Sequence, residues 1–455
     1  MPVTAVLDVG KTNVKLVLFE GTAVLWQAST PNRSLPAPPY PHADVEAIWR
    51  FLMAGLREAA RHHAIEDIVV TSHGATLALV GDGELALPVM DYEFAGVDAI
   101  ETAYAPFRPP FAETLSPPIS AGLNAGKQVF YQEAMHPEAF ARVRHILPYA
   151  QYFAWRLTGI ARGEVTGLGC HADLWAIPGG HLSSLATRRG WEPLFPPMVP
   201  AYAVIGPPSS AVLAETGLPP TVRVRAGIHD SSGSLLPHLL AIEPPFTVIS
   251  TGTWVVIMAL GAAAARLDPA RDMLAYADVE GRGVPAAKFM GGREFAIILA
   301  DGGTACDETD VAAAIAAGVL ALPSFVANGG PFPGRPAAIR GSLPAGDGMR
   351  AALASLYCAL VTDYLLEALD AARGPLVIEG SFALNRCYCG ILAALRPGQD
   401  VLTGADGGGT AYGASLLAIW PQGPERPPMA RTPAYADAEG LLRYRALWRA
   451  ALASS

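Results

Sequence analysis

Positive charge is scarce in this chain of 455 residues. Lysine and arginine together number 32 against 41 acidic residues, which gives a formal net charge of -9, and lysine occurs only at positions 11, 15, 127 and 288. Proteins that bind nucleic acid usually carry a basic stripe, so we expect no nucleic-acid partner. Charged residues are only 16% of the chain and hydrophobic residues are 51%, which excludes a disordered protein and predicts roughly two or three folded domains.

Cysteine is also infrequent. The five cysteines, at positions 170, 306, 358, 387 and 389, are odd in number and too few for a disulfide framework in a chain of this length. Cys387 and Cys389 are separated by one residue, and no second pair stands at zinc-finger spacing. We therefore expect ordinary core or helix-face thiols and no structural metal.

Signals for secretion or membrane insertion are missing. No basic segment precedes an apolar stretch at the N-terminus, so a secretory signal is not expected. One uncharged run, 246–265, is long enough to span a bilayer, but a Ser-Thr-Gly-Thr-Trp turn at 250–254 lies between two β-branched runs. That pattern predicts a hairpin rather than a membrane helix. We expect a soluble, cytoplasmic protein without a membrane partner.

The first half of the sequence predicts alternating strands and helices. Strands are expected at 5–9 and 14–19 around a polar Gly-Lys-Thr-Asn turn, and another at 68–71. A helix is expected at 45–63, with Asp44 as its N-cap and an apolar face. This alternation indicates an α/β fold.

The second half repeats the same order. Strands are predicted at 246–250 and 254–258 around a Gly/Thr turn, followed by a long helix at 349–372, a strand at 376–378, a helix at 385–395 and a helix opening at Gly407, Gly408 and Gly409. Proline breaks the pattern near 235–245, so we divide the chain into domains 1–240 and 241–455. Two halves that open alike suggest a duplicated fold.

The Gly10-Lys11-Thr12 turn is similar to the end of a P-loop but fails two requirements. Position 5 holds Ala where a P-loop needs Gly, and the chain continues as a strand instead of a helix. A hairpin turn can still present backbone N–H groups, with Thr12 and Asn13, to a phosphate. The alternative is a polar hairpin tip that binds nothing. The turn at Gly252 and Thr253 has the same two interpretations, a phosphate site or a turn without a ligand.

Two aspartates complete the candidate chemistry. Asp8, on the strand before the first turn, is placed to hold Mg2+ beside phosphates. Asp230 precedes a run of small residues, so it is either a helix N-cap or a base that accepts a proton from an attacking hydroxyl. His229 beside it either tunes the base or packs as an ordinary histidine.

The order of these motifs resembles the FGGY family of carbohydrate kinases, in the actin-like ATPase superfamily with two ribonuclease-H-like domains. The resemblance rests on Asp-Val-Gly-Lys-Thr-Asn at 8–13, Gly-Ile-His-Asp at 227–230, Ser-Thr-Gly-Thr-Trp at 250–254 and the glycine-rich segment at 407–409. Between them, Thr-Ser-His-Gly at 71–74 and Tyr-Phe-Ala-Trp-Arg-Leu-Thr-Gly at 152–159 are similar to the rhamnulose and fuculose kinase branch. The likeness covers almost the whole chain.

The resemblance implies a role for each matching residue. Asp230 would be the catalytic base, with Asp8 and Asp230 as metal-associated carboxylates for Mg2+. The ATP and phosphate contacts would be Gly10, Lys11, Thr12, Asn13, Gly252, Thr253, Gly380, Ser381, Asn385, Gly407 and Gly408, and the sugar contacts would be His73, Gly74, Asp91, Glu93 and Asp230. The first domain would then bind sugar and phosphate, and the second the nucleotide, with a cleft between them.

The resemblance therefore implies an ATP- and Mg2+-dependent kinase that phosphorylates a primary hydroxyl of a small ketose such as L-rhamnulose or L-fuculose. The alternatives are a xylulose- or ribulose-type kinase and a non-catalytic protein that senses sugar or nucleotide. His73-Gly74 and Asp91-Tyr92-Glu93 depart from the better-known branches, and Lys11 either reaches a phosphate or faces solvent. A homodimer is compatible with the family.

Overall fold

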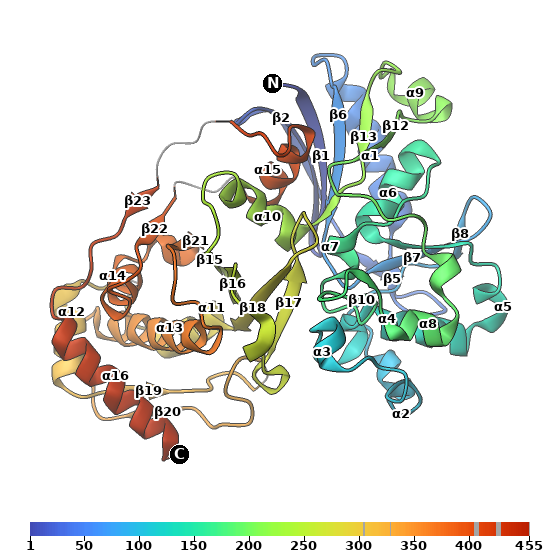
Figure 1. Ribbon diagram of the computed structural model, residues 1–455. Coiled ribbons are helices and arrows are strands. Elements are labelled where there is room, and N and C mark those ends of the chain that lie inside the picture. Colours follow the sequence, from blue (N-terminus) through green and yellow to red (C-terminus); the bar gives the residue numbers. More distant parts are fainter. Residues whose placement is uncertain (304, 328, 405–408, 425–428, 455) are drawn as a thin grey trace. The chain divides into compact units, whose positions relative to one another are not determined.

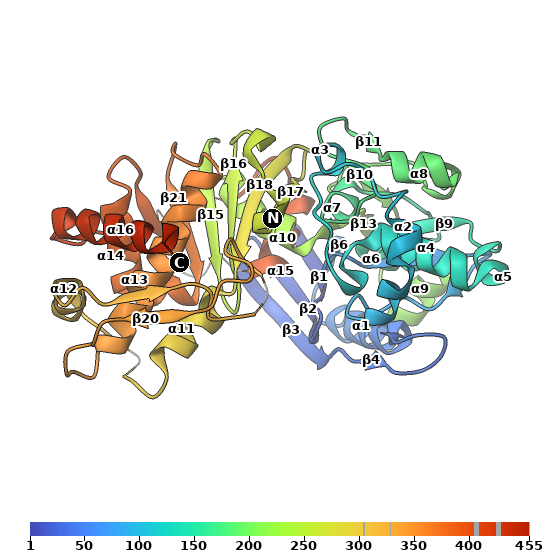
Figure 2. The same ribbon diagram turned by 90° about the horizontal axis from the view of Figure 1, so that it is seen from below.

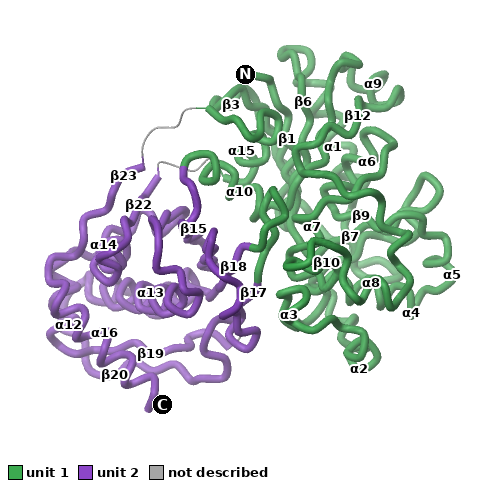
Figure 3. Tube along the Cα trace, viewed as in Figure 1, with its two compact units in different colours: residues 1–241, 275–283, 408–426 green, residues 242–274, 284–407, 427–455 purple. Residues whose placement is uncertain are grey.

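The computed structural model describes residues 1–303, 305–327, 329–404, 409–424 and 429–454. These residues form two compact units (Figure 3). Unit 1 consists of residues 1–241, 275–283 and 408–426, and unit 2 of residues 242–274, 284–407 and 427–455. The prediction of two α/β units is thus confirmed.

The strands of unit 1 are β1 (Val3–Val9), β2 (Asn13–Glu20), β3 (Ala23–Pro31), β4 (Ser34–Leu35), β5 (His42–Ala43), β6 (Asp67–Ser72), β7 (Leu77–Val80), β8 (Leu85–Leu87), β9 (His145–Pro148), β10 (Trp175–Ala176), β11 (His181–Leu182), β12 (Val204–Gly206), β13 (Arg223–Arg225) and β14 (Ile228–His229). Its helices are α1 (Val45–Ala59), α2 (Glu101–Tyr104), α3 (Phe111–Thr114), α4 (Ala125–Met135), α5 (Pro137–Phe140), α6 (Tyr149–Thr158), α7 (Val165–Leu168), α8 (Ser184–Arg189), α9 (Ser210–Thr216), α10 (Asp230–Leu239) and α15 (Gly409–Ser415).

The strands of unit 2 are β15 (Phe246–Thr251), β16 (Val255–Leu260), β17 (Met273–Ala277), β18 (Gly283–Phe289), β19 (Leu320–Leu322), β20 (Ala338–Arg340), β21 (Leu376–Gly380), β22 (Val401–Thr403) and β23 (Ala430–Arg431). Its helices are α11 (Gly291–Leu299), α12 (Glu308–Ala316), α13 (Met349–Ala368), α14 (Arg386–Leu395) and α16 (Ala438–Ala453). The end of the β17–β18 hairpin is the 275–283 segment that belongs with unit 1.

The main sheets of the two units share one topology. In unit 1 the order is β12-β13-β6-β1-β2-β3, with β14 also pairing β6 (Figure 1). In unit 2 the order is β17-β18-β16-β15-β21-β22-β23 (Figure 2). In each unit the first strand pairs antiparallel with the second and parallel with the strand that follows the intervening helices. This repetition supports the duplicated fold predicted from the sequence.

Side-chain alternation along β1 divides the core of unit 1 into two layers. Ala5, Leu7 and Val9 pack with α1 and α6, whereas Val6 packs on the opposite face with α10 and α15. Because successive strand residues point to opposite faces, Asp8 lies on the α10 face. The predicted N-cap of α1 is confirmed, since Asp44 Oδ1 accepts from the backbone N–H of Ala47 at 2.9 Å.

The chain enters unit 1 three times, which the division at residues 240 and 241 does not describe. The second passage is anchored by backbone hydrogen bonds from Ala275 to Leu115 (3.1 Å) and from Ala277 to Gly169 (2.9 Å). In the third passage, α15 packs against α10 and β1, and Tyr412 contacts Phe19 with ring centroids 5.8 Å apart. These contacts join residues far apart in sequence, so composition alone does not reveal them.

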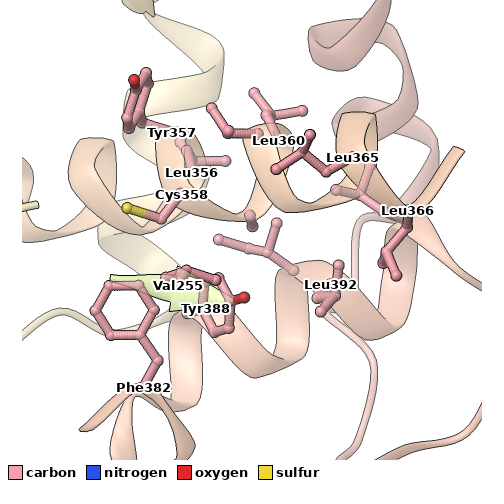
Figure 4. Close-up of a cluster of buried hydrophobic side chains, with 14 of the residues drawn as sticks. Val255, Leu356, Tyr357, Cys358, Leu360, Leu365, Leu366, Phe382, Tyr388 and Leu392 are labelled. Carbon is pink, nitrogen blue, oxygen red and sulfur yellow. The ribbon is translucent and has the colours of Figure 1, made fainter. Parts of the chain in front are cut away.

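A central buried helix organises unit 2. α13 packs against α11, α12 and α14, and its apolar side chains meet the first turns of α14 (Figure 4). It is the one described helix that is long and apolar enough to cross a membrane, and 83% of its apolar window is buried in the protein. It therefore has the character of a core helix. The predicted end at residue 372 is four residues too far, because Leu369 already caps the helix.

One carboxylate on α13 is fully buried. Asp363 pairs with Arg396 after α14 at 2.8 Å, and with Arg449 (2.8 Å) and Arg445 (3.3 Å) of α16. The carboxylate thus ties three helices together. A buried charge is tolerated when partners replace the water that it loses on folding.

We expect Asp363→Ala to destabilise unit 2 by about 3–5 kcal/mol, because it removes the buried carboxylate with which three partly buried arginines pair. Urea unfolding measures the loss. The matched control is Asp400→Ala, which removes an exposed carboxylate that pairs with Arg431 at 2.7 Å and should change stability by less than about 1 kcal/mol. Equal effects of the two variants would contradict this role of Asp363.

Candidate active site

Three parallel strands of unit 1 end side by side. Asp8 of β1 pairs in register with Thr71 of β6, and Thr71 pairs with Ile228 of β14; the next row contains Val9, Ser72 and His229. Asp8 therefore lies at the same sheet edge as the residues that follow β6 and β14, which are His73 and Asp230. Ligands of α/β sheets bind outside the carboxyl ends of the strands. The pairing brings three predicted site residues together.

Asp230 is the first residue of α10. The N-cap position belongs to His229, so the alternative that Asp230 is an N-cap is wrong. Its carboxylate accepts the backbone N–H of Ser231 at 2.6 Å and lies 3.0 Å from His229 Nε2. The side chain keeps 32% of its surface exposed, so a substrate hydroxyl can reach it.

His229 is the principal partner of Asp230. Its ring stacks on Tyr276 at 5.9 Å and 25°, and Nδ1 lies 3.3 Å from Ser232 Oγ. Burial lowers the pKa of His229, but Cys170 and Asp230 oppose this effect and hold it well above its usual value. Burial likewise raises the pKa of Asp230, and the charge and hydrogen bond of His229 more than offset it, so the net shift is downward. The carboxylate is therefore ionised at neutral pH.

Asp8 titrates differently. Burial, followed by the charge of Asp230, raises its pKa from 3.8 to about 6, and Lys15 opposes the shift only in part. A carboxylate whose pKa is raised by a second, ionised carboxylate nearby forms with it a natural site for a cation. The two aspartates at this edge thus have pKa values shifted in opposite directions.

The β1–β2 turn is braced by a residue that sequence reasoning missed. Gly10 N–H donates to the carbonyl of Asn13 at 3.0 Å, and Asn32 donates its side-chain amide to the carbonyl of Gly10 at 2.7 Å and its backbone N–H to that of Thr12 at 2.9 Å. Thr12 and Asn13 are exposed, as a phosphate site requires. No sequence pattern marks Asn32, because its role arises from where β3 ends.

The side chain of Lys11 lies among acidic and aromatic side chains and does not extend into bulk solvent. Its ammonium pairs with Asp91, lies 3.2 Å from Glu93 Oε2, and sits 4.6 Å above the ring of Tyr92. Asp91 also accepts from Ser34 and, at 2.9 Å, from the backbone N–H of Glu93. The oxygens of Asp91 are therefore engaged in holding Lys11, which places the predicted sugar residues Asp91 and Glu93 around a cation.

His73 presents a defined hydrogen-bonding face. Its Nδ1 lies 3.1 Å from the carbonyl of Gly74, and a carbonyl only accepts, so Nδ1 carries the proton. Burial lowers the pKa of His73, which leaves the ring neutral and Nε2 an acceptor. The ring packs against Tyr92 and Tyr149 at centroid distances of 5.2 and 5.4 Å.

Gly74 is required by close packing. A Cβ at this position would lie 2.6 Å from Cys170 Sγ and 2.8 Å from His229 Nε2. Any side chain would therefore displace the histidine that orients Asp230. The structure thus gives Gly74 a packing role beside Cys170 and His229, whereas the sequence predicted a contact with the sugar.

The buried carboxyl group of Glu164 is linked to His229 through Thr166. Glu164 Oε1 and Oε2 accept from the backbone and the hydroxyl of Thr166, and Thr166 Oγ1 accepts the His229 N–H at 2.9 Å. Burial raises the pKa of Glu164 to about 7. The chain from Glu164 to His229 fixes the backbone from which Asp230 projects.

Unit 2 contains a separate cavity of about 830 Å3. Four of the predicted ATP residues line it, namely Gly252, Thr253, Ser381 and Asn385. The lining also includes Gly292, Arg293, Phe295, Ala305, Cys306, Phe382, Leu384 and Arg386, which sequence reasoning missed. Their segments lie far apart in sequence, so no local motif signals them.

Two glycines allow the backbones around this cavity to approach closely. A Cβ on Gly292, in the first turn of α11, would lie 2.1 Å from the carbonyl oxygen of Gly252. Gly380 has φ +78°, and a Cβ there would lie 1.8 Å from the carbonyl oxygen of Thr251. Only glycine fits either position. The predicted residue Gly380 does not line the cavity, but it allows the backbone around the cavity to pack closely.

The cavity has apolar and polar sides. Phe295 and Phe382 contact each other at 5.5 Å, and Leu384 leaves 87% of its surface exposed beside them. Asn385 caps α14 by accepting the Tyr388 N–H at 2.9 Å and donates to Ser355 at 3.0 Å. Its amide is thus committed to the fold. The predicted residues Gly407 and Gly408 lie outside the described residues.

Among the residues that the structure describes, no group of three or more His, Cys, Asp or Glu side chains has the arrangement of a metal site. The paired carboxylates Asp8 and Asp230 nevertheless fit a Mg2+ ion that also takes phosphate and water ligands, because Mg2+ is usually bound through one or two carboxylates. The charge of Asp230 raises the pKa of Asp8, and this observation supports the fit.

Comparison with known proteins gives a consistent picture. The family model described as "Carbohydrate kinase FGGY, C-terminal domain" matches residues 243–427. The crystal structure of a carbohydrate kinase from Novosphingobium aromaticivorans is 36% identical, covers 100% of both chains and superposes with a TM-score of 0.91. A xylulose kinase from Rhodospirillum rubrum is 20% identical over 98% of both chains, with a TM-score of 0.80, which shows a shared fold.

A curated L-fuculokinase from Salmonella typhi is 27% identical over 266 residues. The match covers 56% of this chain and 56% of that protein. The chain thus aligns with little more than half the length of this relative.

We expect Asp8→Asn to stabilise unit 1 at neutral pH in the absence of divalent cations. The folded state holds the pKa of Asp8 near 6 against 3.8 for the free group, so ionisation costs stability as the pH rises through this window. The gain should be at most about 3 kcal/mol above pH 6 and should vanish below pH 4. Thermal unfolding across this range measures it.

Asp82→Asn is the matched control, because that carboxylate is exposed and pairs with the exposed Arg144. Its stability should follow the wild type at every pH. A destabilised Asp8→Asn protein, or a gain in stability that does not depend on pH, would contradict the prediction. It would show that burial and Asp230 do not disfavour the ionised form of Asp8.

Proposed function

This chain belongs to the FGGY family of carbohydrate kinases, and we propose that it transfers the γ-phosphoryl group of ATP to a primary hydroxyl of a small ketose. The observation that carries the proposal is the ionised, partly exposed Asp230 held against His229 at the end of β14. In this position the carboxylate accepts the proton of the attacking hydroxyl. Phosphoryl transfer otherwise needs positioning and charge neutralisation.

ATP is the cosubstrate that the family implies, and the cavity of unit 2 is its proposed binding site. The apolar side formed by Phe295, Phe382 and Leu384 suits the faces of a purine. Arg293, Thr253 and Ser381 supply polar groups along the same cavity. The exposed Gly/Thr turns of the two units are the proposed phosphate contacts.

Mg2+ is proposed as the counter-ion of the phosphates, with Asp8 and Asp230 as the residues that would hold it. A bound Mg2+ neutralises charge that develops on the transferred group. Asp8 requires such a partner more than Asp230 does, because burial and the neighbouring carboxylate disfavour its ionised form.

The proposed acceptor is a neutral ketose, with L-fuculose or L-rhamnulose as first choices and xylulose next. His73 Nε2 can accept a hydrogen bond from a sugar hydroxyl, and Lys11 can donate one. In this cluster the carboxylates of Asp91, Glu93 and Asp230 outnumber the cations Lys11 and His229, since His73 is neutral. A sugar acid would meet net negative charge, so a neutral acceptor is favoured.

An ADP-release assay with ATP, Mg2+ and a panel of ketoses, aldoses, polyols and sugar acids tests the proposed reaction. We expect turnover with a neutral ketose, and a loss of about 10²–10⁴-fold in kcat in Asp230→Asn. ATP binding, measured by calorimetry, should be retained. Asp82→Asn serves as the matched carboxylate control and should keep full activity.

Full kcat in Asp230→Asn would remove this residue from the mechanism. Silence across the panel, with ATP and a sugar still bound, would favour the sensor function over the kinase. Preference for a sugar acid would contradict the charge argument while leaving phosphoryl transfer intact.

We expect Lys11→Met to raise KM for the acceptor by roughly 10–100-fold, because a hydrogen bond from a charged donor contributes about 1.5–3 kcal/mol. KM for ATP should stay within about twofold, since Lys11 is held on the side of Asp91 and Glu93. Arg144→Met, at an exposed cation of the same unit, is the control. A rise in KM for ATP alone would instead assign Lys11 to the phosphates.

A further inference from the structure

Two cysteines from distant parts of unit 2 meet at the edge of the proposed nucleotide cavity. Cys306 lies two residues before α12, and Cys387 is the second residue of α14. The Cys387 thiol donates to the carbonyl oxygen of Cys306 at 3.1 Å, and the interaction between the two thiols shifts the pKa of each. Cys306 is half-buried and lines the cavity, whereas Cys387 is 7% exposed behind it.

The two thiols have unequal surroundings. The hydrogen bond from Cys387 lowers the pKa of Cys306, burial opposes this effect, and Ser355 Oγ at 3.8 Å supports it. The same contact and burial raise the pKa of Cys387 far above its usual value. Thiolates are the reactive form of cysteine, so Cys306 is the attacking sulfur and Cys387 the second thiol.

We propose that Cys306 and Cys387 form a redox-sensitive dithiol that a peroxide converts into a disulfide, and that this oxidation and nucleotide binding exclude each other. The first part rests on the 3.1 Å contact of the Cys387 thiol with the backbone carbonyl of Cys306 and on the position of Cys306 in the cavity wall. The second part also rests on the proposed function, because it takes the cavity of unit 2 as the ATP site.

The chemistry needs a peroxide and no metal. The Cys306 thiolate attacks one oxygen of hydrogen peroxide, the O–O bond breaks, and a sulfenic acid and hydroxide form. The Cys387 sulfur then attacks the sulfenic sulfur, the S–O bond breaks, and the leaving hydroxide takes up the Cys387 thiol proton and departs as water. The hydroxide of the first step becomes water with the proton that Cys306 lost on ionising. Two thiols and one peroxide thus give one disulfide and two waters, and a dithiol reductant reverses the change.

The link to nucleotide binding follows from position. A nucleotide in the cavity covers Cys306 and denies peroxide access to its sulfur. A disulfide fixes Cys306 to the first turn of α14, next to the cavity residues Asn385 and Arg386. Shielding of the sulfur slows its oxidation, whereas the effect on affinity arises from the disulfide, which holds the start of α14 away from the geometry that binds nucleotide. That coupling is reciprocal, so nucleotide disfavours the disulfide by the same factor by which the disulfide weakens nucleotide binding.

The chain offers a matched control on the same helix. Cys389 lies two residues after Cys387, is 2% exposed, and donates to the carbonyl of Phe382 at 3.2 Å. Burial raises its pKa to about 12. Cys389 is therefore expected to remain a thiol under conditions that oxidise the Cys306–Cys387 pair.

The test treats the full chain with hydrogen peroxide and then measures free thiols, intact mass and ATP binding by calorimetry. We expect the wild type and Cys389→Ser to lose two thiols and two hydrogen masses, and to regain them with dithiothreitol. Peptide mapping should join Cys306 to Cys387. Cys306→Ser and Cys387→Ser should form no internal disulfide, and ATP affinity of the oxidised wild type should fall at least about tenfold.

Saturating ATP should slow thiol loss in the wild type by at least about tenfold, if the cavity binds nucleotide. A disulfide that forms equally fast with and without ATP, while ATP binds elsewhere with unchanged affinity, would overturn the coupling and the nucleotide assignment of this cavity. Failure of the two cysteines to join in folded protein that binds ATP normally would overturn the dithiol proposal and leave the proposed function standing.

Discussion

The parallel pairing of β1 with β6, and of β6 with β14, is the constraint on which the rest of unit 1 depends. Parallel strands end at one edge of a sheet, so the residues that follow them become neighbours although 65 or more positions separate them. Asp8, His73 and Asp230 share an edge for this reason. The helices on both faces of the sheet bury its apolar residues and hold this edge in place.

The carboxylates at this edge divide their tasks through their surroundings. Asp230 has a histidine partner that stabilises its charge, whereas Asp8 meets burial and a second carboxylate. Asp230 is therefore ionised, whereas the ionised form of Asp8 is disfavoured unless a proton or a cation binds to it. Phosphoryl transfer uses both properties, since it needs a base beside the acceptor and a cation beside the phosphates.

Unit 2 repeats the sheet topology but builds a different kind of site. Its cavity is formed by the β15–β16 turn, the start of α11 and the segment that enters α14, which approach one another because Gly292 and Gly380 have no side chains. The buried helix α13 packs against α11 and α14, and its apolar side chains meet those of α14 (Figure 4). A duplicated framework thus supplies a carboxylate edge in one unit and a mixed apolar and polar cavity in the other.

The sequence by itself indicated the two opening hairpins, several of the helices, the α/β class and the family, because apolar periodicity, Gly/Thr turns and the order of short motifs are local signals. Asp8, Asp230, Thr253 and Ser381 were proposed as site residues in this way. Tertiary structure decided what Lys11 contacts, that Asn32 braces the first turn, that Cys306 meets Cys387, and that residues 275–283 and 408–426 return to unit 1. These features depend on contacts between distant segments, and their physical cause is the packing of strands and helices, which no spacing along the chain encodes.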